Sequence, residues 1–260
     1  MKIPAPSGAT SSPVSIHEPQ PCSALTARRC FNNPRQRRYN VAHGAEPWEQ
    51  ALTHPIDITV PMDSSLVLYP GDTPPVVRRL ASIAQGAPLT ASEIAIGCHV
   101  GTHVDAPAHF LPDGLTVDQL ALRHFYGPAV VVEFPNRDRI SADDLSRAAI
   151  LPARHILLKT RNSALLAQSR FHPDHCYLAP DAADLLLTFR PLSIGFDYYS
   201  LDPPRETAFP AHRAMARAGL PVFVCLDLQR VEPGAYTFVA LPLPLAGLEA
   251  IPVRAVLFPP

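Results

Sequence analysis

Four residues of the types that bind metal ions lie within eleven positions of this 260-residue chain. They are His99, His103, Asp105 and His109, in the run HVGTHVDAPAH. Neutral imidazole nitrogens and carboxylate oxygens are the usual protein ligands of zinc and manganese. A single buried His is more often a hydrogen-bonded core residue, but burying four such groups without a partner would cost several kcal/mol. The run therefore predicts a metal site.

The spacing of the run also predicts the backbone that presents these side chains. On a helix, Asp105 would lie about 200° around the axis from His103, at ~100° per residue. On an extended chain, alternate side chains face the same way. The β-branched residues, the glycine and the proline between the ligands disfavour a helix. We expect an extended strand over 99–105 that leads into a loop, with Gly101 leaving space between the imidazoles.

The run resembles the signature of the metal-dependent cyclase-like hydrolases, which include bacterial kynurenine formamidases and isatin hydrolases. Every fixed position of the pattern His-x-Gly-[Thr/Ala]-His-x-Asp-x-Pro-x-His is matched. The resemblance implies an α/β fold, the swivelling β/β/α domain with a mixed sheet and flanking helices, usually in a homodimer. It extends from about residue 52 to the C-terminus through segments 69–74, 158–163, 194–197, 200–203, 211–213, 235–243 and 252–257.

The resemblance implies a role for each residue of the run. His99, His103 and Asp105 match metal ligands, and Asp105 would bridge to a second ion in the two-metal members of the family. His109 matches the catalytic acid/base of the family. Thr102 is expected to support the ligands from outside the coordination sphere.

A second metal site would need residues from later in the chain. His212 matches one of its ligands, but the usual Glu, twelve residues later, is replaced here by Val224. Valine cannot bind a metal. Cys225 and Asp227 lie nearby, but on a regular strand both would face the opposite side. Zinc or manganese is therefore expected as the cofactor, with one or two ions per chain.

Other side chains are expected to contact the substrate or to orient a ligand. Tyr69, Phe110 and Tyr198 could wall an aromatic pocket, although they could equally be ordinary packing residues. Asp197 could orient a ligand His, and capping a turn is an equally good reading of it. The resemblance points to hydrolysis of N-formylkynurenine to kynurenine and formate, a reaction of tryptophan catabolism, or of a related arylformamide or cyclic amide.

Two alternatives to amide hydrolysis use the same residues. One is a metal-dependent cyclase or lyase that acts on a small carbonyl metabolite, in which His109 would move a proton. The other is a non-catalytic binding protein that kept the fold after losing the Glu. The intact ligand set argues against the second alternative, because decay would be expected to strike the ligands as well.

The composition narrows the partners and the compartment. A formal net charge of -1 gives no reason to expect a nucleic acid or a membrane surface as partner. The expected partner is therefore a small-molecule substrate. No apolar run approaches the ~18 residues that a transmembrane helix needs. Five scattered cysteines are not a disulfide framework and are typical of a reducing cytoplasm.

The first residues differ in composition from the rest of the chain. Residues 1–48 are rich in Ser, Pro, Ala and Arg and carry little acidic charge, which predicts a disordered extension or a transit peptide. The folded domain is expected over 49–260. Strands are predicted at 56–60, 129–134, 155–159 and 192–196, and helices are predicted to begin after Ser141 and at Pro180 and to span 210–218.

Overall fold

A computed structural model describes residues 54–148, 150, 152–203 and 205–260. The extension expected over residues 1–48 lies outside this part of the chain and stays a prediction. The described residues contain no helix that is both long enough and apolar enough to cross a membrane.

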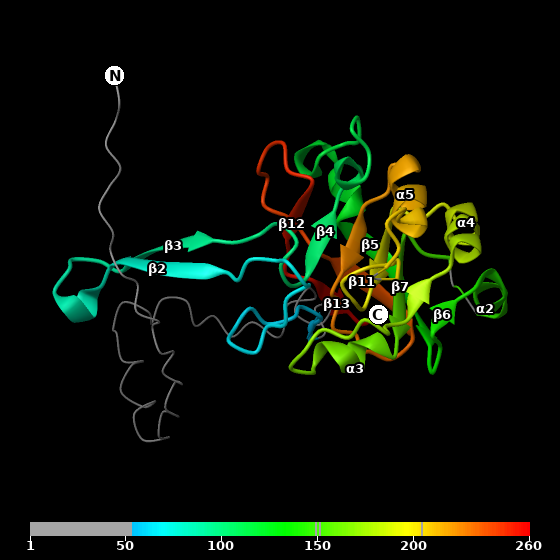
Figure 1. The fold of residues 1–260 in the computed structure, drawn as a ribbon, viewed down its shortest axis with the longest axis horizontal. Helices are drawn as coiled ribbons and strands as arrows, with labels where there is room; N and C mark the ends of the chain where they lie inside the picture. The colour runs from blue at the N-terminus through cyan, green and yellow to red at the C-terminus, as the bar shows by residue number, and fades with distance from the viewer. Residues whose placement is uncertain (1–53, 149, 151, 204) are drawn as a thin grey trace, which may run out of the picture. The chain divides into compact units, whose positions relative to one another are not determined.

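A mixed sheet of nine strands forms the centre of the fold (Figure 1). Its strands, in sheet order, are β1 (Ile56–Asp57), β13 (Val256–Phe258), β11 (Gly234–Val239), β5 (Tyr126–Phe134), β7 (His155–Thr160), β9 (Ser193–Phe196), β10 (Val222–Val224), β4 (His103–Asp105) and β12 (Ala250–Pro252). Strands β5, β7, β9 and β10 are parallel, and the other pairs are antiparallel. This confirms the predicted α/β class with a mixed sheet.

The sheet curls back on itself. Only residues 253–255 separate β12, at one edge, from β13, next to the other edge. An extended chain spans at most ~3.6 Å per residue, so the two edges must approach each other. Accordingly, Ile251 of β12 and Leu257 of β13 belong to the same buried cluster.

In the described part of the chain, four α-helices accompany the sheet: α2 (Ala142–Arg147), α3 (Asn162–Leu166), α4 (Pro180–Thr188) and α5 (Pro210–Arg217). Ser141 caps α2 in a capping box with Asp144, and Pro180 occupies the first position of α4. Both starts were predicted, as was α5. The other elements are short: β6 (Arg139–Ile140), β8 (Tyr177–Leu178), and the 3-10 turns η3 (Pro107–His109), η4 (Val117–Gln119) and η5 (Leu122–His124).

Alternation along the strands divides the core between the two faces of the sheet. Val130 and Val132 of β5 pack with the buried sides of α2, α4 and α5, whereas Ala129 and Val131 pack into the interior of the curl. Along β4, Val104 faces the interior of the curl. His103 and Asp105 must therefore face the side that carries the helices, and this decides where the site forms.

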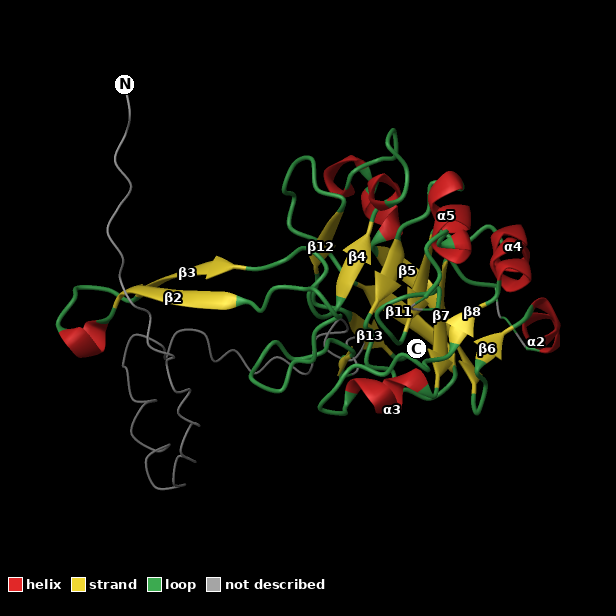
Figure 2. Ribbon diagram, in the orientation of Figure 1, coloured by secondary structure: helices red, strands yellow, loops and turns green. Residues whose placement is uncertain are grey.

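A separate hairpin consists of β2 (Val76–Ala81) and β3 (Ala91–Ala95), joined through η2 (Ile83–Gln85). It extends from the main sheet, and its two strands pair only with each other in the described fold (Figure 2). It carries a series of exposed apolar side chains, namely Val76, Val77, Leu80, Ile83, Leu89 and Ile94.

Candidate metal centre

Strand β4 is shorter than the predicted strand over 99–105. It begins at His103, and His99 lies in a turn in which the Val100 amide donates to the Gly97 carbonyl. Gly101 adopts a φ of 68°, in the left-handed region that favours glycine, and a Cβ there would meet Met62 at 2.9 Å. The prediction of a continuous strand was wrong, because this glycine bends the chain instead of separating two imidazoles along an extended backbone.

The bend still brings the three predicted ligands together. His99, His103 and Asp105 each offer a ligand atom, and these atoms lie within 4.8 Å of one another. The Asp105 Oδ1 atom lies 3.0 Å from His99 Nδ1 and 3.3 Å from His103 Nε2. Oδ1 is buried and has no hydrogen-bond donor among the described residues. A buried carboxylate oxygen between two imidazole nitrogens fits a divalent metal, which would satisfy all three atoms.

The charges at this site favour an ionised carboxylate. Burial alone would raise the pKa of Asp105, but the neighbouring His103 and His99 imidazoles outweigh it and hold that pKa well below its usual value. For His99, burial lowers the pKa, and the carboxylates of Asp105 and Glu249 outweigh this and raise it. The ligand set therefore has an anionic oxygen ready for a cation.

Backbone and side-chain acceptors fix the outer nitrogens of two imidazoles. The His103 Nδ1–H group donates to the Gly101 carbonyl at 2.8 Å, since a carbonyl can only accept. The His212 Nδ1 atom lies 2.6 Å from the buried carboxylate of Asp202. Both contacts occupy Nδ1, so each ring directs Nε2 away from its anchor, as metal-binding or proton-accepting histidines require.

The site also contains His109, the predicted acid/base. It ends the turn η3, which follows β4 directly, and its ring centroid lies 4.2 Å from that of His99. Partial burial lowers the pKa of His109. The carboxylate of Asp105 raises this pKa, but the nearby imidazoles of His99 and His212 lower it further, and the net shift is downward. A lowered pKa keeps the ring neutral near pH 7, which suits a proton acceptor.

His212 lies in the first turn of α5, as predicted, but outside the group of three ligands. The ring of Phe110 stacks against it, with centroids 4.7 Å apart. Val224 is paired with His103 across β10 and β4, so its side chain occupies the place beside the ligands where the second site would need a carboxylate. Cys225 follows the last residue of β10, has a φ of 54°, and lies outside the group of three ligands.

A cavity of about 410 Å³ opens over these residues. Tyr69 and Phe110 line it, and their contact with a substrate stays a prediction. Tyr198 does not: it is buried in the core under the helices, and its hydroxyl bonds to the backbone of His172. The adjacent Tyr199 lines the cavity instead. The remaining lining residues are Asp72, His99, His103, Asp105, His109, Ser200, Thr207, Phe209, His212 and Arg213.

The two residues expected to support the ligands have other contacts. The Thr102 hydroxyl donates to the Cys225 carbonyl at 2.6 Å and accepts from the Val60 amide, so it ties β4 to its surroundings without touching an imidazole. Asp197 accepts from the backbone amides and hydroxyls of Thr160 and Ser163 at 2.6–3.0 Å. These contacts are those of a capping carboxylate, and no imidazole is among the hydrogen-bond partners of Asp197 in the described residues.

Asp202 and Glu249 contact imidazoles of the site without having been predicted to do so. Asp202 lies in a segment that resembled the family pattern, so its position in that pattern could have identified it. Glu249 is a lone acidic residue in a loop, and no local pattern distinguishes it from a surface carboxylate.

Replacing Asp197 with Ala is expected to lower the free energy of unfolding by about 3 kcal/mol, since each buried donor left unpaired costs roughly 1–3 kcal/mol. Burial raises the pKa of Asp197 to about 6, because it outweighs the hydrogen bonds to Asp197, which lower that pKa. Urea denaturation measures the change, with Asp138→Ala, at a side chain that is 94% exposed, as the control. A stable Asp197→Ala protein with lost metal would instead favour a role in orienting a ligand.

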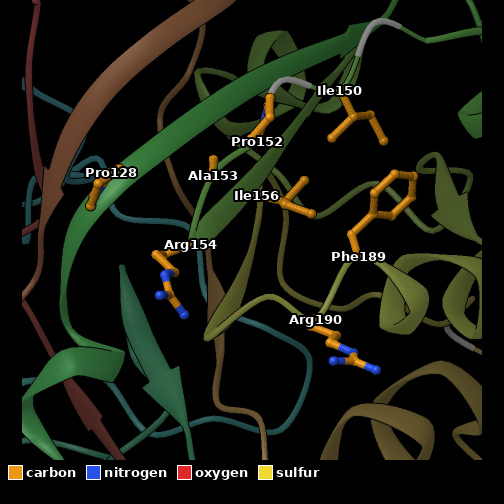
Figure 3. A pocket seen from close by; sticks show the side chains of 8 residues that line it. All are labelled: Pro128, Ile150, Pro152, Ala153, Arg154, Ile156, Phe189 and Arg190. Carbon is orange, nitrogen blue, oxygen red and sulfur yellow. The ribbon is translucent and has the colours of Figure 1, made fainter.

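A second hollow, of about 520 Å³, has different chemistry (Figure 3). Two guanidinium groups, those of Arg154 and Arg190, lie beside an apolar wall. The described residues that line it include no imidazole, thiol or carboxylate that could hold a metal. The remaining lining residues are Pro128, Ile150, Pro152, Ala153, Ile156 and Phe189.

Comparison with known proteins identifies the family of the chain. Residues 56–203 match the model of the Cyclase family. The kynurenine formamidase of Geobacillus thermodenitrificans (strain NG80-2) is 34% identical over 202 residues, which cover 78% of this chain and 96% of that enzyme. A solved structure described as a potential metal-dependent hydrolase with cyclase activity is 30% identical, covers 78% of this chain and 96% of its own, and has a TM-score of 0.66.

The fold is shared more widely than the sequence. Isatin hydrolase A from Ralstonia solanacearum is 24% identical, with a TM-score of 0.68 over 78% of this chain and 90% of that one. Because the Cyclase model matches more than half of this chain, and because a 34% identical relative matches over most of both sequences, this chain belongs to the cyclase family of metal-dependent hydrolases.

Proposed function

We propose that this protein is a metal-dependent amidohydrolase that cleaves an arylformamide, with N-formylkynurenine as substrate and kynurenine and formate as products. The observation that carries the proposal is the convergence of His99, His103 and Asp105 beneath a cavity that also holds His109. The similarity to kynurenine formamidase over nearly the whole length of that enzyme supports the choice of substrate.

His99, His103 and Asp105 would hold the metal ion. A divalent ion bound there would lower the pKa of a water molecule and polarise the carbonyl of the amide. His109 takes the proton of the attacking water, because its lowered pKa leaves the ring neutral and able to accept. The same imidazole then returns the proton to the leaving nitrogen as the carbon–nitrogen bond breaks, so formate and the free amine are released.

The walls of the cavity suit an aromatic amide. Tyr69 and Tyr199 lie with ring centroids 6.3 Å apart, and Phe110 and Phe209 lie 5.5 Å apart on the side of α5. Flat side chains of this kind form offset or edge contacts with a substrate ring. A volume of about 410 Å³ falls within the range of roughly 300–1,000 Å³ of small-molecule sites.

Turnover of purified protein with N-formylkynurenine tests the proposal. We expect formate release that stops when a chelator removes the metal and returns when zinc or manganese is added. Isatin, a cyclic amide, is the comparison substrate. Hydrolysis of isatin alone would move the substrate to cyclic amides, and no hydrolysis of either amide by metal-loaded protein would contradict the proposed reaction.

A single ion per chain, zinc or manganese, is part of the proposal. Val224, beside His103, supplies no ligand atom for a second ion. His212 lies outside the group of three ligands, and the ring of Phe110 stacks on it. The second site therefore has one imidazole and the shared carboxylate, which is too few for a tetrahedral or octahedral ion.

We also propose that the protein works as a homodimer in the cytoplasm. The exposed apolar side chains of the hairpin, including Val77 and Ile94, support an interface with a second copy, because contiguous apolar patches mark interaction sites. Sedimentation of the purified chain tests the dimer, and a monomer at micromolar concentration would contradict it.

The cytoplasmic location is supported by the cysteines of the described residues. The thiols of Cys98, Cys176 and Cys225 are free, which is consistent with a reducing compartment.

A further inference from the structure

Glu249 lies directly before β12, beside the strand that carries two of the ligands. Its carbonyl accepts from the Ala106 amide at 2.8 Å, and the next residue, Ala250, is paired with Asp105. The preceding carbonyl, of Leu248, accepts from the Val117 amide at 2.9 Å. The backbone on which the Glu249 carboxylate stands is therefore fixed relative to β4.

The carboxylate of Glu249 contacts the outer nitrogen of His99. Its Oε1 atom lies 3.2 Å from His99 Nε2, while His99 Nδ1 lies 3.0 Å from Asp105 Oδ1 on the opposite side of the ring. An ionised carboxylate can only accept a hydrogen bond, so Nε2 must carry the proton in this contact. A metal ion binds the neutral ring, and with the one remaining proton held on Nε2 by Glu249, Nδ1 presents its lone pair to the position between the three ligands.

His99 needs such a partner more than the other imidazoles do. His103 stands on a strand and is anchored to the Gly101 carbonyl, and His212 is anchored to Asp202. His99 stands on a turn, and its side chain is 28% exposed. Among the described residues, Glu249 is the only hydrogen-bond partner of its ring outside the ligand group.

We propose that Glu249 is a positioning residue of the metal centre, which fixes the tautomer and the orientation of His99 so that Nδ1 binds the ion. This inference rests on the proposed metal site. Carboxylate partners of this kind raise the basicity of a ligand imidazole, and their loss typically weakens metal binding by about 10–100-fold. Glu249 contacts the nitrogen that faces away from Asp105, so its place is outside the coordination sphere.

Metal affinity tests this role directly. Full-length Glu249→Ala, Glu249→Gln and wild-type proteins are stripped of metal and titrated with Zn²⁺ against a chromophoric chelator. We expect Glu249→Ala to bind Zn²⁺ about 10–100-fold more weakly, and Glu249→Gln, whose neutral amide oxygen can still accept, to lose less. The Co²⁺-substituted proteins should differ in their visible absorption bands. Glu232→Ala removes an exposed carboxylate and is the matched control.

The outcomes separate this inference from the proposed function. Unchanged Zn²⁺ affinity, within about twofold, and unchanged Co²⁺ bands in a folded Glu249→Ala protein would overturn the positioning role while the metal centre stands. Wild-type protein that binds no Zn²⁺ would overturn the metal centre, and the positioning role with it. The Glu249 side chain is 40% exposed, so its loss should leave the midpoint of thermal unfolding of the metal-free protein unchanged. Glu249→Gln repeats the Zn²⁺ titration with a side chain of nearly the same shape.

Discussion

Replacing Asp105 with Asn is expected to remove the metal ion and to reduce amide hydrolysis by about a thousandfold or more. Asn has nearly the shape of Asp but lacks its charge, and Oδ1 is the buried atom that lies within 3.3 Å of both ligand imidazoles. Metal polarisation of a carbonyl contributes several kcal/mol to a transition state, and each ~1.4 kcal/mol is a factor of ten in rate. Elemental mass spectrometry and kcat/KM of the same preparation measure both effects.

Asp113→Asn is the control for this variant, since Asp113 is an exposed carboxylate in the loop that follows η3. It should keep its metal and its activity. An Asp105→Asn protein that retains both would place the metal, or the reaction, elsewhere. A protein that retains the ion but loses the activity would show that Asp105 acts on the substrate and is not needed to hold the metal.

Replacing His109 with Ala is expected to lower kcat by about 10²–10⁴-fold, the usual contribution of a positioned acid/base, while the metal stays bound. The reason is geometric. The ring centroid of His109 lies 4.2 Å from that of His99, close enough for His109 to reach a water or a leaving nitrogen at the same point, yet His109 lies outside the group of three ligands.

His54→Ala, at an exposed position at the start of the described chain, controls for the loss of an imidazole. Near-normal turnover by metal-loaded His109→Ala would show that another group moves the proton. Loss of the metal from this variant would instead make His109 a ligand, contrary to its place outside the group of three ligands.

Much of the fold follows from local rules that the sequence displays. The capping box at Ser141, the proline that opens α4 and the runs of apolar residues in β5 and β7 are decided within a few residues, and the structure confirms them. The curl of the sheet depends on pairing between distant segments, such as β12 with β4. No window of sequence contains that information.

The site divides in the same way. The convergence of the three ligands was predicted, but the backbone that achieves it was not. Residues 99–102 form a turn where a strand was predicted, because Gly101 adopts a left-handed conformation. Tyr198 and Tyr199 are adjacent, and which of them faces the cavity depends on the backbone after β9. Glu249 reaches His99 from 150 residues away, through a contact that only the folded chain creates.

The central claim is that one metal ion at His99, His103 and Asp105 supports hydrolysis of an arylformamide. Metal-free protein should be titrated with zinc or manganese while the initial rate of N-formylkynurenine hydrolysis and the bound metal are measured together. We predict no hydrolysis without metal and a rate that rises linearly and stops at one ion per chain. Full hydrolysis by metal-free protein would contradict the claim, as would a rate that appears only with the second ion.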